Sequence, residues 1–238
     1  MSSIDSVKDG RYEIRRFFDS IAFRYDFLNH FLSFQLDEIW RRKACDCILQ
    51  GHERTLLDLG VGTGKFLKLF LKRQSWDYAV GLDFAPAMLE LARRELGGPA
   101  KFLGGDFHHL PFKENSFDLV VSSFTLRSVQ DMPAFLKEVY GILSGGGQAG
   151  FLCLTRPQNP FFRLLYVPYL KFYLPLIGRL FSGNTKAYQF LSHSILSFQE
   201  PARTEAMMRE IGFTETHVRP FSLGMVTLIT GRKPSPRN

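Results

Sequence analysis

The sequence predicts an α/β protein: a Rossmann-like, seven-stranded and mostly parallel sheet with helices on both faces. Two observations carry this prediction. Short apolar runs alternate with amphipathic stretches along most of the chain, which is typical of βαβ units and of a parallel sheet. A loop with three glycines also connects the first apolar run to the first amphipathic stretch, where sheets of this class bind ligands. We expect an N-terminal helical lid before this core and a helical insertion after the fifth strand.

Glu13 to about Cys47 has a helical and aromatic pattern that breaks near Asn29 and Ser33. After it, seven short apolar runs are the expected strands, and five stretches with helical spacing are the expected helices. The strands lie at 55–59, 78–83, 100–106, 117–124, 147–155, 213–221 and 224–232. The helices lie at 65–73, 86–96, 133–143, 185–196 and 201–212. Pro86 suits the first turn of its helix, and Gly212 suits a helix end.

Composition and charge narrow the classes of function. The 238 residues suit one large domain, and the net charge of +7 gives a surface that can attract nucleic acid, anionic substrates or lipid headgroups. No dense Lys/Arg tract with interleaved aromatic residues is present, so we expect no nucleic-acid partner. Three cysteines without a CxxC pair argue against disulfides and against a metal site. We see no secretory signal and no apolar run of about 18 residues, and expect a cytoplasmic protein.

The glycine loop, 58–64, follows the first expected strand and reads D-L-G-V-G-T-G. Gly60, Gly62 and Gly64 allow a tight turn and remove the side chains that would keep a ligand away from the backbone. A βα turn that merely uses glycine is the alternative for such a loop taken alone. The spacing differs from the GxGxxG fingerprint of dinucleotide-binding proteins, and no phosphate-binding GxxxxGK[ST] loop is present.

Three acidic residues follow three successive strands around this loop. Asp58 begins the loop, Asp83 ends the second strand, and Asp106 ends the third. A carboxylate at Asp83 can accept both hydroxyl protons of a ribose, and Asp106 is placed to meet an adenine edge. Each acid alone also fits a helix cap or a solvated charge, but together they form a cradle for a cationic nucleoside without phosphate. S-adenosylmethionine, with its ribose, adenine and sulfonium, fits this description.

Several further motifs resemble those of the class I S-adenosylmethionine-dependent methyltransferases, and more specifically the ubiquinone/menaquinone biosynthesis C-methyltransferases. The most specific is YDFLNHFLSFQLDEIW at 25–40. SFTLRSVQD at 123–131 is similar to the family's S-F-G-L-R-N-V stretch, and GILSGGGQAGFLCLTRP at 141–157 to its V-L-K-P-G-G segment. The resemblance extends from about Arg16 to Lys233.

The resemblance implies methyl transfer to a ring carbon of a polyprenylated quinol, such as demethylmenaquinol or a methoxy-benzoquinol, with S-adenosylmethionine as cofactor. It also implies cofactor contacts and a homodimer. The implied contacts are Thr63 in the loop, Asp83 on the ribose, Asp106 with Phe107 near the adenine, and Ser123 at the end of the fourth strand. We therefore divide the chain into an N-terminal helical lid, 1–50, and a methyltransferase domain, 51–238, with an aromatic helical insertion at 156–199.

For catalysis we expect a group that stabilises the phenolate as the quinol carbon becomes nucleophilic. Arg127 follows the fourth strand and is the first candidate, and since arginine stays protonated it serves as a stabiliser and not as the base. A structural salt bridge is its alternative role. Tyr25 and Asp26 are the second candidates, although Tyr25 also fits a packing role. His108 and His109 lie beside the cradle and are weaker candidates for the base.

The chain departs from the family pattern at four positions. Lys65 and Asp37 stand where the family usually has Asp and His, respectively. Ser128 replaces the Asn of L-R-N, and Cys153 replaces the acid of E-F-S-K-P. These changes leave the cofactor cradle intact, but they leave the identity of the methyl acceptor open.

Residues 160–181 suit an element that lies in the headgroup plane of a membrane. They are apolar and aromatic, with Arg163, Lys171 and Arg179 among them, and Pro168 and Pro175 divide them into short pieces. We expect peripheral contact of this segment with the cytoplasmic membrane face. A lid over the protein's own core, or a dimer interface, is an equally good interpretation.

Three other functions stay open. The chain fits a methyltransferase of the same fold that acts on another lipophilic acceptor. It also fits a non-catalytic homologue that binds cofactor or polyprenyl lipid, since Lys65 and Ser128 depart from the pattern. An NAD-dependent oxidoreductase fits least, because the loop lacks the dinucleotide spacing.

Overall fold

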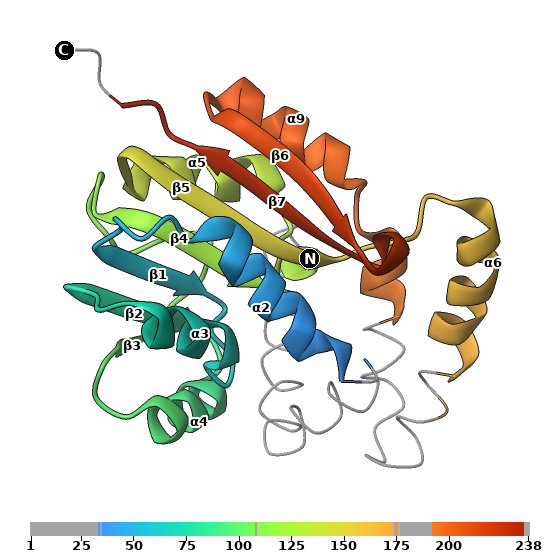
Figure 1. The fold of residues 1–238 in the computed structure, drawn as a ribbon, viewed down its shortest axis with the longest axis horizontal. Helices are drawn as coiled ribbons and strands as arrows, with labels where there is room; N and C mark the ends of the chain where they lie inside the picture. The colour runs from blue at the N-terminus through green and yellow to red at the C-terminus, as the bar shows by residue number, and fades with distance from the viewer. Residues whose placement is uncertain (1–32, 34, 108, 174–175, 177–191, 236–238) are drawn as a thin grey trace, which may run out of the picture.

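A computed structural model describes residues 33, 35–107, 109–173, 176 and 192–235. Its core is one seven-stranded sheet in the order β3-β2-β1-β4-β5-β7-β6 (Figure 1). The first five strands in this order are parallel, and β7 runs antiparallel to both of its neighbours. The predicted Rossmann-like, mostly parallel sheet is confirmed.

The strands agree closely with the predicted ranges. They are β1 (Thr55–Leu59), β2 (Tyr78–Asp83), β3 (Lys101–Gly104), β4 (Phe117–Ser123), β5 (Leu143–Leu154), β6 (Thr214–Phe221) and β7 (Val226–Arg232). β3 is shorter than predicted. β5 begins earlier, because Leu143 already pairs with Phe117 and a register shift separates this pair from the pairing of Gln148 with Leu119.

Helices precede and connect these strands. They are α2 (Leu36–Ile48), α3 (Lys65–Arg73), α4 (Pro86–Leu96), α5 (Met132–Ile142), α6 (Pro160–Pro168) and α9 (Pro201–Ile211). Short turns are η1 (Leu126–Ser128), the π-helical η2 (Tyr169–Tyr173) and η3 (Ser222–Gly224), and residues 192–197 are also helical. None of the helices in the described ranges is both long and apolar enough to cross a membrane.

The sheet is buried on both faces because neighbouring residues of each strand point to opposite sides. Leu56 belongs to a core cluster with residues of α2 and α3, whereas Leu57 belongs to a second cluster with residues of α5 and α9. The prediction of helices on both faces is therefore confirmed.

Helix α2 lies within the predicted lid, 1–50, and packs directly on the sheet (Figure 1). Trp40, Ala44 and Ile48 form its buried stripe. A Cβ atom on Gly150 of β5 would lie 2.5 Å from Cδ1 of Ile48, so the helix rests against bare backbone there. The boundaries predicted for the lid and the methyltransferase domain stay predictions.

The chain order reverses between β1 and β4, which are neighbours in the sheet. Ligands of open parallel sheets bind at the carboxyl ends of the strands at this switch point. The glycine loop follows β1 there, and Ser123 ends β4 there.

Candidate active site

The glycine loop begins with a turn that only glycine fits. The amides of Gly60 and Val61 donate hydrogen bonds of 2.7 and 3.0 Å to the carbonyl of Leu82 in β2. Gly60 has φ +71°, and a Cβ atom there would lie 2.6 Å from the side chain of Thr125 and 3.1 Å from the ring of Phe107. The turn at Gly60 is thus fixed by β2 and by the turn after β4, and it packs against Thr125 and Phe107.

Asp83 connects the end of β2 to this loop. Its carboxylate accepts hydrogen bonds from the amides of Gly62, at 2.9 Å, and Ala85, at 3.0 Å, and the residue is 5% exposed. A Cβ atom on Gly62 would have nothing nearer than a backbone oxygen at 4.0 Å, so the loop is open at this residue. The carboxylate therefore orients the loop, and the predicted contact with a ribose stays a prediction.

Asp58 is the most unusual group at the site. It is 1% exposed, and neither of its carboxylate oxygens has a hydrogen-bond partner within the described part of the chain. Burial raises the pKa of Asp58 to about 7; Arg41 and the nearby backbone amide of Leu67 oppose this rise, and Asp83 adds to it. An unpaired buried acceptor destabilises the fold. A ligand that brings a positive charge or a donor would satisfy it.

Asp106 and Phe107 follow β3 and reach the same edge of the sheet. Phe107 is buried, with edge-on contacts to Phe84 and Phe135 at ring-centroid distances of 6.4 and 6.3 Å. The ring of Phe107 packs beneath Gly60, whereas Asp106 is half-buried. The adenine contact predicted for these two residues stays a prediction.

The remaining predicted cofactor residues lie in the loop or at the end of β4. Thr63 is buried, and Gly64 precedes the first turn of α3. Ser123 is half-buried, and its carbonyl accepts a hydrogen bond of 3.1 Å from Oγ1 of Thr125. The fold thus brings all nine predicted cofactor residues to one edge of the sheet; they are Asp58, Gly60, Gly62, Thr63, Gly64, Asp83, Asp106, Phe107 and Ser123.

Arg127 lies in η1, directly after the β4 turn. Its Nη1 donates a hydrogen bond of 3.0 Å to Oγ of Ser194, in the helical stretch 192–197. Arg127 therefore connects the cofactor edge of the sheet to the insertion, and its catalytic role stays a prediction. Tyr25, Asp26 and His108 lie outside the described residues, and His109 is exposed.

Sequence reasoning missed three residues at this edge: Arg41, Phe124 and Thr125. The buried guanidinium of Arg41 forms an ion pair of 2.6 Å with Asp37 and lies 4.9 Å from the centre of the Phe124 ring. A charged residue within the apolar stripe of α2 is the signal that could have revealed Arg41. Thr125 has no such signal, because its contact with Gly60 depends on the tertiary fold.

The three cysteines are free, and within the described ranges no group of three or more His, Cys, Asp or Glu side chains is placed to hold a metal ion. The acids at this edge therefore do not form a metal centre among the described residues.

Comparisons with known structures agree with this geometry. A methyltransferase structure from Thermotoga maritima superposes with a TM-score of 0.66 at 21% identity, covering 92% of this chain and 99% of that one. The phosphoethanolamine N-methyltransferase 2 of Haemonchus contortus, in complex with S-adenosyl-L-methionine, gives a TM-score of 0.60 at 14% identity, over 82% and 52% of the two chains. At these identities the likeness shows the fold.

Sequence comparison decides the family, because the model of the ubiE/COQ5 methyltransferase family matches residues 4–233. The chain belongs to this family. The demethylmenaquinone methyltransferase of Thermus thermophilus is 37% identical over 91% of this chain and all of that protein. The ubiquinone/menaquinone biosynthesis C-methyltransferase of Geotalea daltonii is 35% identical over 93% of this chain and 96% of that protein.

As a ubiE/COQ5 family member, the chain is a C-methyltransferase that uses S-adenosylmethionine, as the sequence predicted. The described residues fit this cofactor. The loop is open at Gly62, so a ligand can approach its backbone. The buried carboxylate of Asp58 suits a cationic ligand. When bound, the cofactor supplies an electrophilic methyl group on a sulfonium.

Proposed function

We propose that this chain methylates a ring carbon of a polyprenylated quinol, with demethylmenaquinol as the first candidate and a methoxy-benzoquinol as the second. The observation that carries the proposal is the family match over 4–233, because relatives that cover nearly the whole chain bear the names demethylmenaquinone methyltransferase and ubiquinone/menaquinone biosynthesis C-methyltransferase. The glycine loop is lined by acids and lacks the phosphate-binding GxxxxGK[ST] pattern, which supports the same reaction.

Methyl transfer to carbon is an in-line displacement, so the protein contributes mainly by alignment and by charge. The loop and Asp83 would hold the nucleoside end of the cofactor, which would supply the methyl group and leave as S-adenosylhomocysteine. The quinol hydroxyl loses its proton as the ring carbon gains the methyl group; that carbon then loses its hydrogen as a proton, and the oxygen regains a proton, so one proton is released in total. Arg127, between the loop edge and the insertion, stabilises the negative charge on the quinol oxygen.

The acceptor is tested by mass spectrometry of quinones in a host that lacks its own enzyme and carries this chain. Restored menaquinone supports the first candidate, and restored ubiquinone supports the second. If neither quinone returns, assays of the purified protein with demethylmenaquinol and with methoxy-benzoquinol follow. Turnover of neither favours another lipophilic acceptor or a non-catalytic homologue.

Arg127→Ala tests the catalytic assignment. We expect kcat with the quinol to fall about 100-fold, as when one oxyanion-stabilising donor is removed, while the affinity for S-adenosylhomocysteine changes less than about two-fold. Ser194→Ala is the matched control, because it removes the hydrogen-bond partner and keeps the guanidinium. Equal losses in both variants contradict the catalytic role and favour a structural one.

We also propose that α6 and η2 rest on the cytoplasmic face of a membrane, where the polyprenyl tail of the acceptor resides. α6 has no buried residue, and Leu164 and Phe172 are 71% and 72% exposed. No acidic residue occurs between Arg156 and Leu176, so the segment suits anionic headgroups. The homodimer that the family resemblance implies stays a prediction.

A further inference from the structure

The turn between β6 and β7, η3, holds three successive residues in the left-handed region of the backbone. Ser222, Leu223 and Gly224 have φ of +45°, +60° and +90°. Glycine adopts this conformation readily, whereas leucine does so rarely and at a cost, and such strain is found mainly at functional sites. Leu223 is also 60% exposed, so burial of its side chain offsets little of this cost.

Hydrogen bonds hold the turn on both sides of Leu223. Nε1 of Trp40, in α2, donates a hydrogen bond of 2.8 Å to Oγ of Ser222. Oγ1 of Thr155, directly after β5, donates one of 2.7 Å to the carbonyl of Gly224. Leu223 therefore lies exposed between two fixed points of a well-held turn.

The turn lies at the carboxyl edge of the sheet, close to the start of α6. Val226, the first residue of β7, pairs with Leu154, the last residue of β5. A Cβ atom on Gly224 would lie 3.4 Å from Cα of Pro157, which precedes α6. Figure 1 shows the turn and α6 at the same end of the molecule. Two segments far apart in the sequence thus place exposed apolar side chains at the edge that also carries the glycine loop.

The charge of both segments suits an anionic surface. No acidic residue occurs between Glu215 and Asn238, which includes the turn, or between Arg156 and Leu176, which includes α6 and η2. The basic residues in these ranges include Arg163, Lys171 and Arg219. Apolar side chains with basic and without acidic neighbours in the sequence are typical of elements that bind anionic headgroups.

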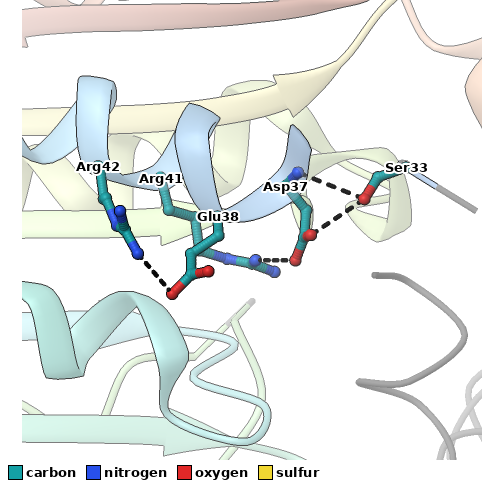
Figure 2. A network of polar contacts seen from close by, with 5 residues as sticks. All are labelled: Ser33, Asp37, Glu38, Arg41 and Arg42. Atoms are coloured by element: carbon teal, nitrogen blue, oxygen red, sulfur yellow. Dashed lines mark hydrogen bonds and ion pairs between the residues drawn. The ribbon is translucent and has the colours of Figure 1, made fainter. Parts of the chain in front are cut away.

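The start of α2, which the turn contacts through Trp40, adds no net negative charge. Its two acids, Asp37 and Glu38, form ion pairs of 2.6 Å with Arg41 and 2.9 Å with Arg42. Figure 2 shows both pairs along the helix. An anionic surface can therefore approach the turn without meeting unbalanced acids from this helix.

We propose that Leu223 is a second membrane anchor beside α6 and η2, so that the carboxyl edge of the sheet faces an anionic bilayer. The inference rests on the membrane contact proposed above and deepens it, because two anchors from separate segments fix the orientation of the protein. In this orientation the glycine loop lies on the side from which a polyprenylated quinol arrives. The quinol ring then leaves the bilayer toward the cofactor site while its tail stays among the lipids.

Leu223→Asn separates the exposed side chain from the backbone strain. Asparagine adopts the left-handed conformation at lower cost than leucine, so the melting temperature should rise by about 1–4 °C. Affinity for vesicles of equal parts phosphatidylcholine and phosphatidylglycerol should fall about ten-fold, because one leucine side chain no longer leaves water on binding. Thermal unfolding and co-sedimentation measure the two effects. A leucine that served only internal packing would show the reverse: a lower melting temperature and unchanged affinity.

Two further variants act as controls. Leu103→Asn is the same substitution at an exposed leucine on β3, at the other end of the molecule (Figure 1), and it should leave vesicle affinity unchanged. Leu223→Phe keeps an apolar side chain at the turn and should retain the affinity. Equal losses in Leu103→Asn and Leu223→Asn overturn the proposal, because the effect would not be local.

The remaining outcomes separate this anchor from the contact made by α6 and η2. Unchanged affinity in Leu223→Asn, together with weakened binding in the double variant Leu164→Glu and Phe172→Glu, overturns the second anchor alone. Conversion of a dimer to a monomer by Leu223→Asn in sedimentation velocity without lipid overturns it too, because a second copy of the chain would be the partner. Failure of the unmodified protein to bind these vesicles overturns both the anchor and the membrane contact on which it rests.

Discussion

The carboxyl edge of the sheet and the α6–η2 segment differ in how deeply their side chains are buried. Around the glycine loop, Leu57, Asp58, Leu59 and Val61 are all buried, and β2 and the turn after β4 hold the loop in place. In α6 no residue is buried, and in η2 only Leu170 is buried. Figure 1 shows α6 beside the body of the protein, at the opposite end of the molecule from β3.

This difference indicates which contacts determine the structure and function of each region. The glycine loop is fixed by contacts within the chain, so small changes there should alter both stability and cofactor binding. The α6–η2 segment has few internal contacts for its apolar side chains, so changes there should alter association with a surface outside the chain. Substitutions in the two regions separate these two kinds of effect.

Gly60→Ala should have the largest effect. The added Cβ atom meets Thr125 at 2.6 Å, and φ +71° is unfavourable for alanine, so we expect a loss of about 3–5 kcal/mol in the free energy of unfolding. Urea unfolding measures this loss, and calorimetry should show weakened binding of S-adenosylhomocysteine.

Gly97→Ala is the matched control for Gly60→Ala. Gly97 has φ +64°, and its added Cβ atom meets nothing within 4 Å. The loss of stability should therefore reflect the backbone conformation alone, about 1–3 kcal/mol, and the cofactor affinity should be unchanged. Equal losses in the two variants contradict the argument that the loop is fixed by its contact with the β4 turn.

Asp58→Asn should have the next largest effect, and that effect depends on pH. The pKa of Asp58 is about 7 in the folded protein, mainly because of burial, against 3.8 as its ordinary value. Between about pH 4 and 7 the folded form binds a proton that the unfolded chain has lost, so the free energy of unfolding falls as pH rises through this window. Above pH 7 the ionisation of Asp58 no longer changes the free energy of unfolding.

Asparagine at this position removes that titration. The variant should gain stability relative to the unmodified protein as pH rises from 4 to 7, by about 2–4 kcal/mol at the upper end. Urea unfolding at pH 4, 5.5 and 7.5 measures the difference. Asp46→Asn, at an exposed ion pair with Arg73, should stay within about 0.5 kcal/mol at each pH. Parallel curves for the unmodified protein and Asp58→Asn would show that Asp58 is ionised throughout.

The sequence sufficed for the fold because the core elements have strong local signals. KFLKLFLKR and PAMLELARREL are the helices α3 and α4 at the predicted residues, and YAVGLD is β2. The start of β5 was missed because the register shift between Phe117 and Leu119 depends on pairing with β4, which local composition does not specify.

The site was predictable only in part for the same reason. Glycines and acids at strand ends stand out in the sequence, so Gly60, Asp58 and Asp83 were found. The contact of Thr125 with Gly60 and the position of Arg41 over Phe124 depend on elements far apart in the chain. Helix α2 packs on β5 and β7 only after folding, and nothing in its own sequence indicates what its buried arginine faces.

The double substitution Leu164→Glu and Phe172→Glu should have the smallest effect on stability. Both side chains are more than two-thirds exposed, so the free energy of unfolding should change by less than about 0.5 kcal/mol. If the segment rests on a bilayer, affinity for vesicles that contain phosphatidylglycerol should fall at least about ten-fold, because two apolar anchors become charged. Co-sedimentation with vesicles measures this affinity.

Leu103→Glu, on β3 at the other end of the molecule, is the control for this pair: it adds a negative charge to an exposed apolar site away from α6 (Figure 1). It should leave vesicle binding nearly unchanged, which separates a local contact from the effect of net charge. Sedimentation velocity without lipid addresses the rival interpretation. If the double variant converts a dimer to a monomer and binds vesicles as the unmodified protein does, the exposed side chains of α6 and η2 face a second copy of the chain. The membrane assignment would then be wrong, whereas the stable glycine loop and its cofactor would be unaffected.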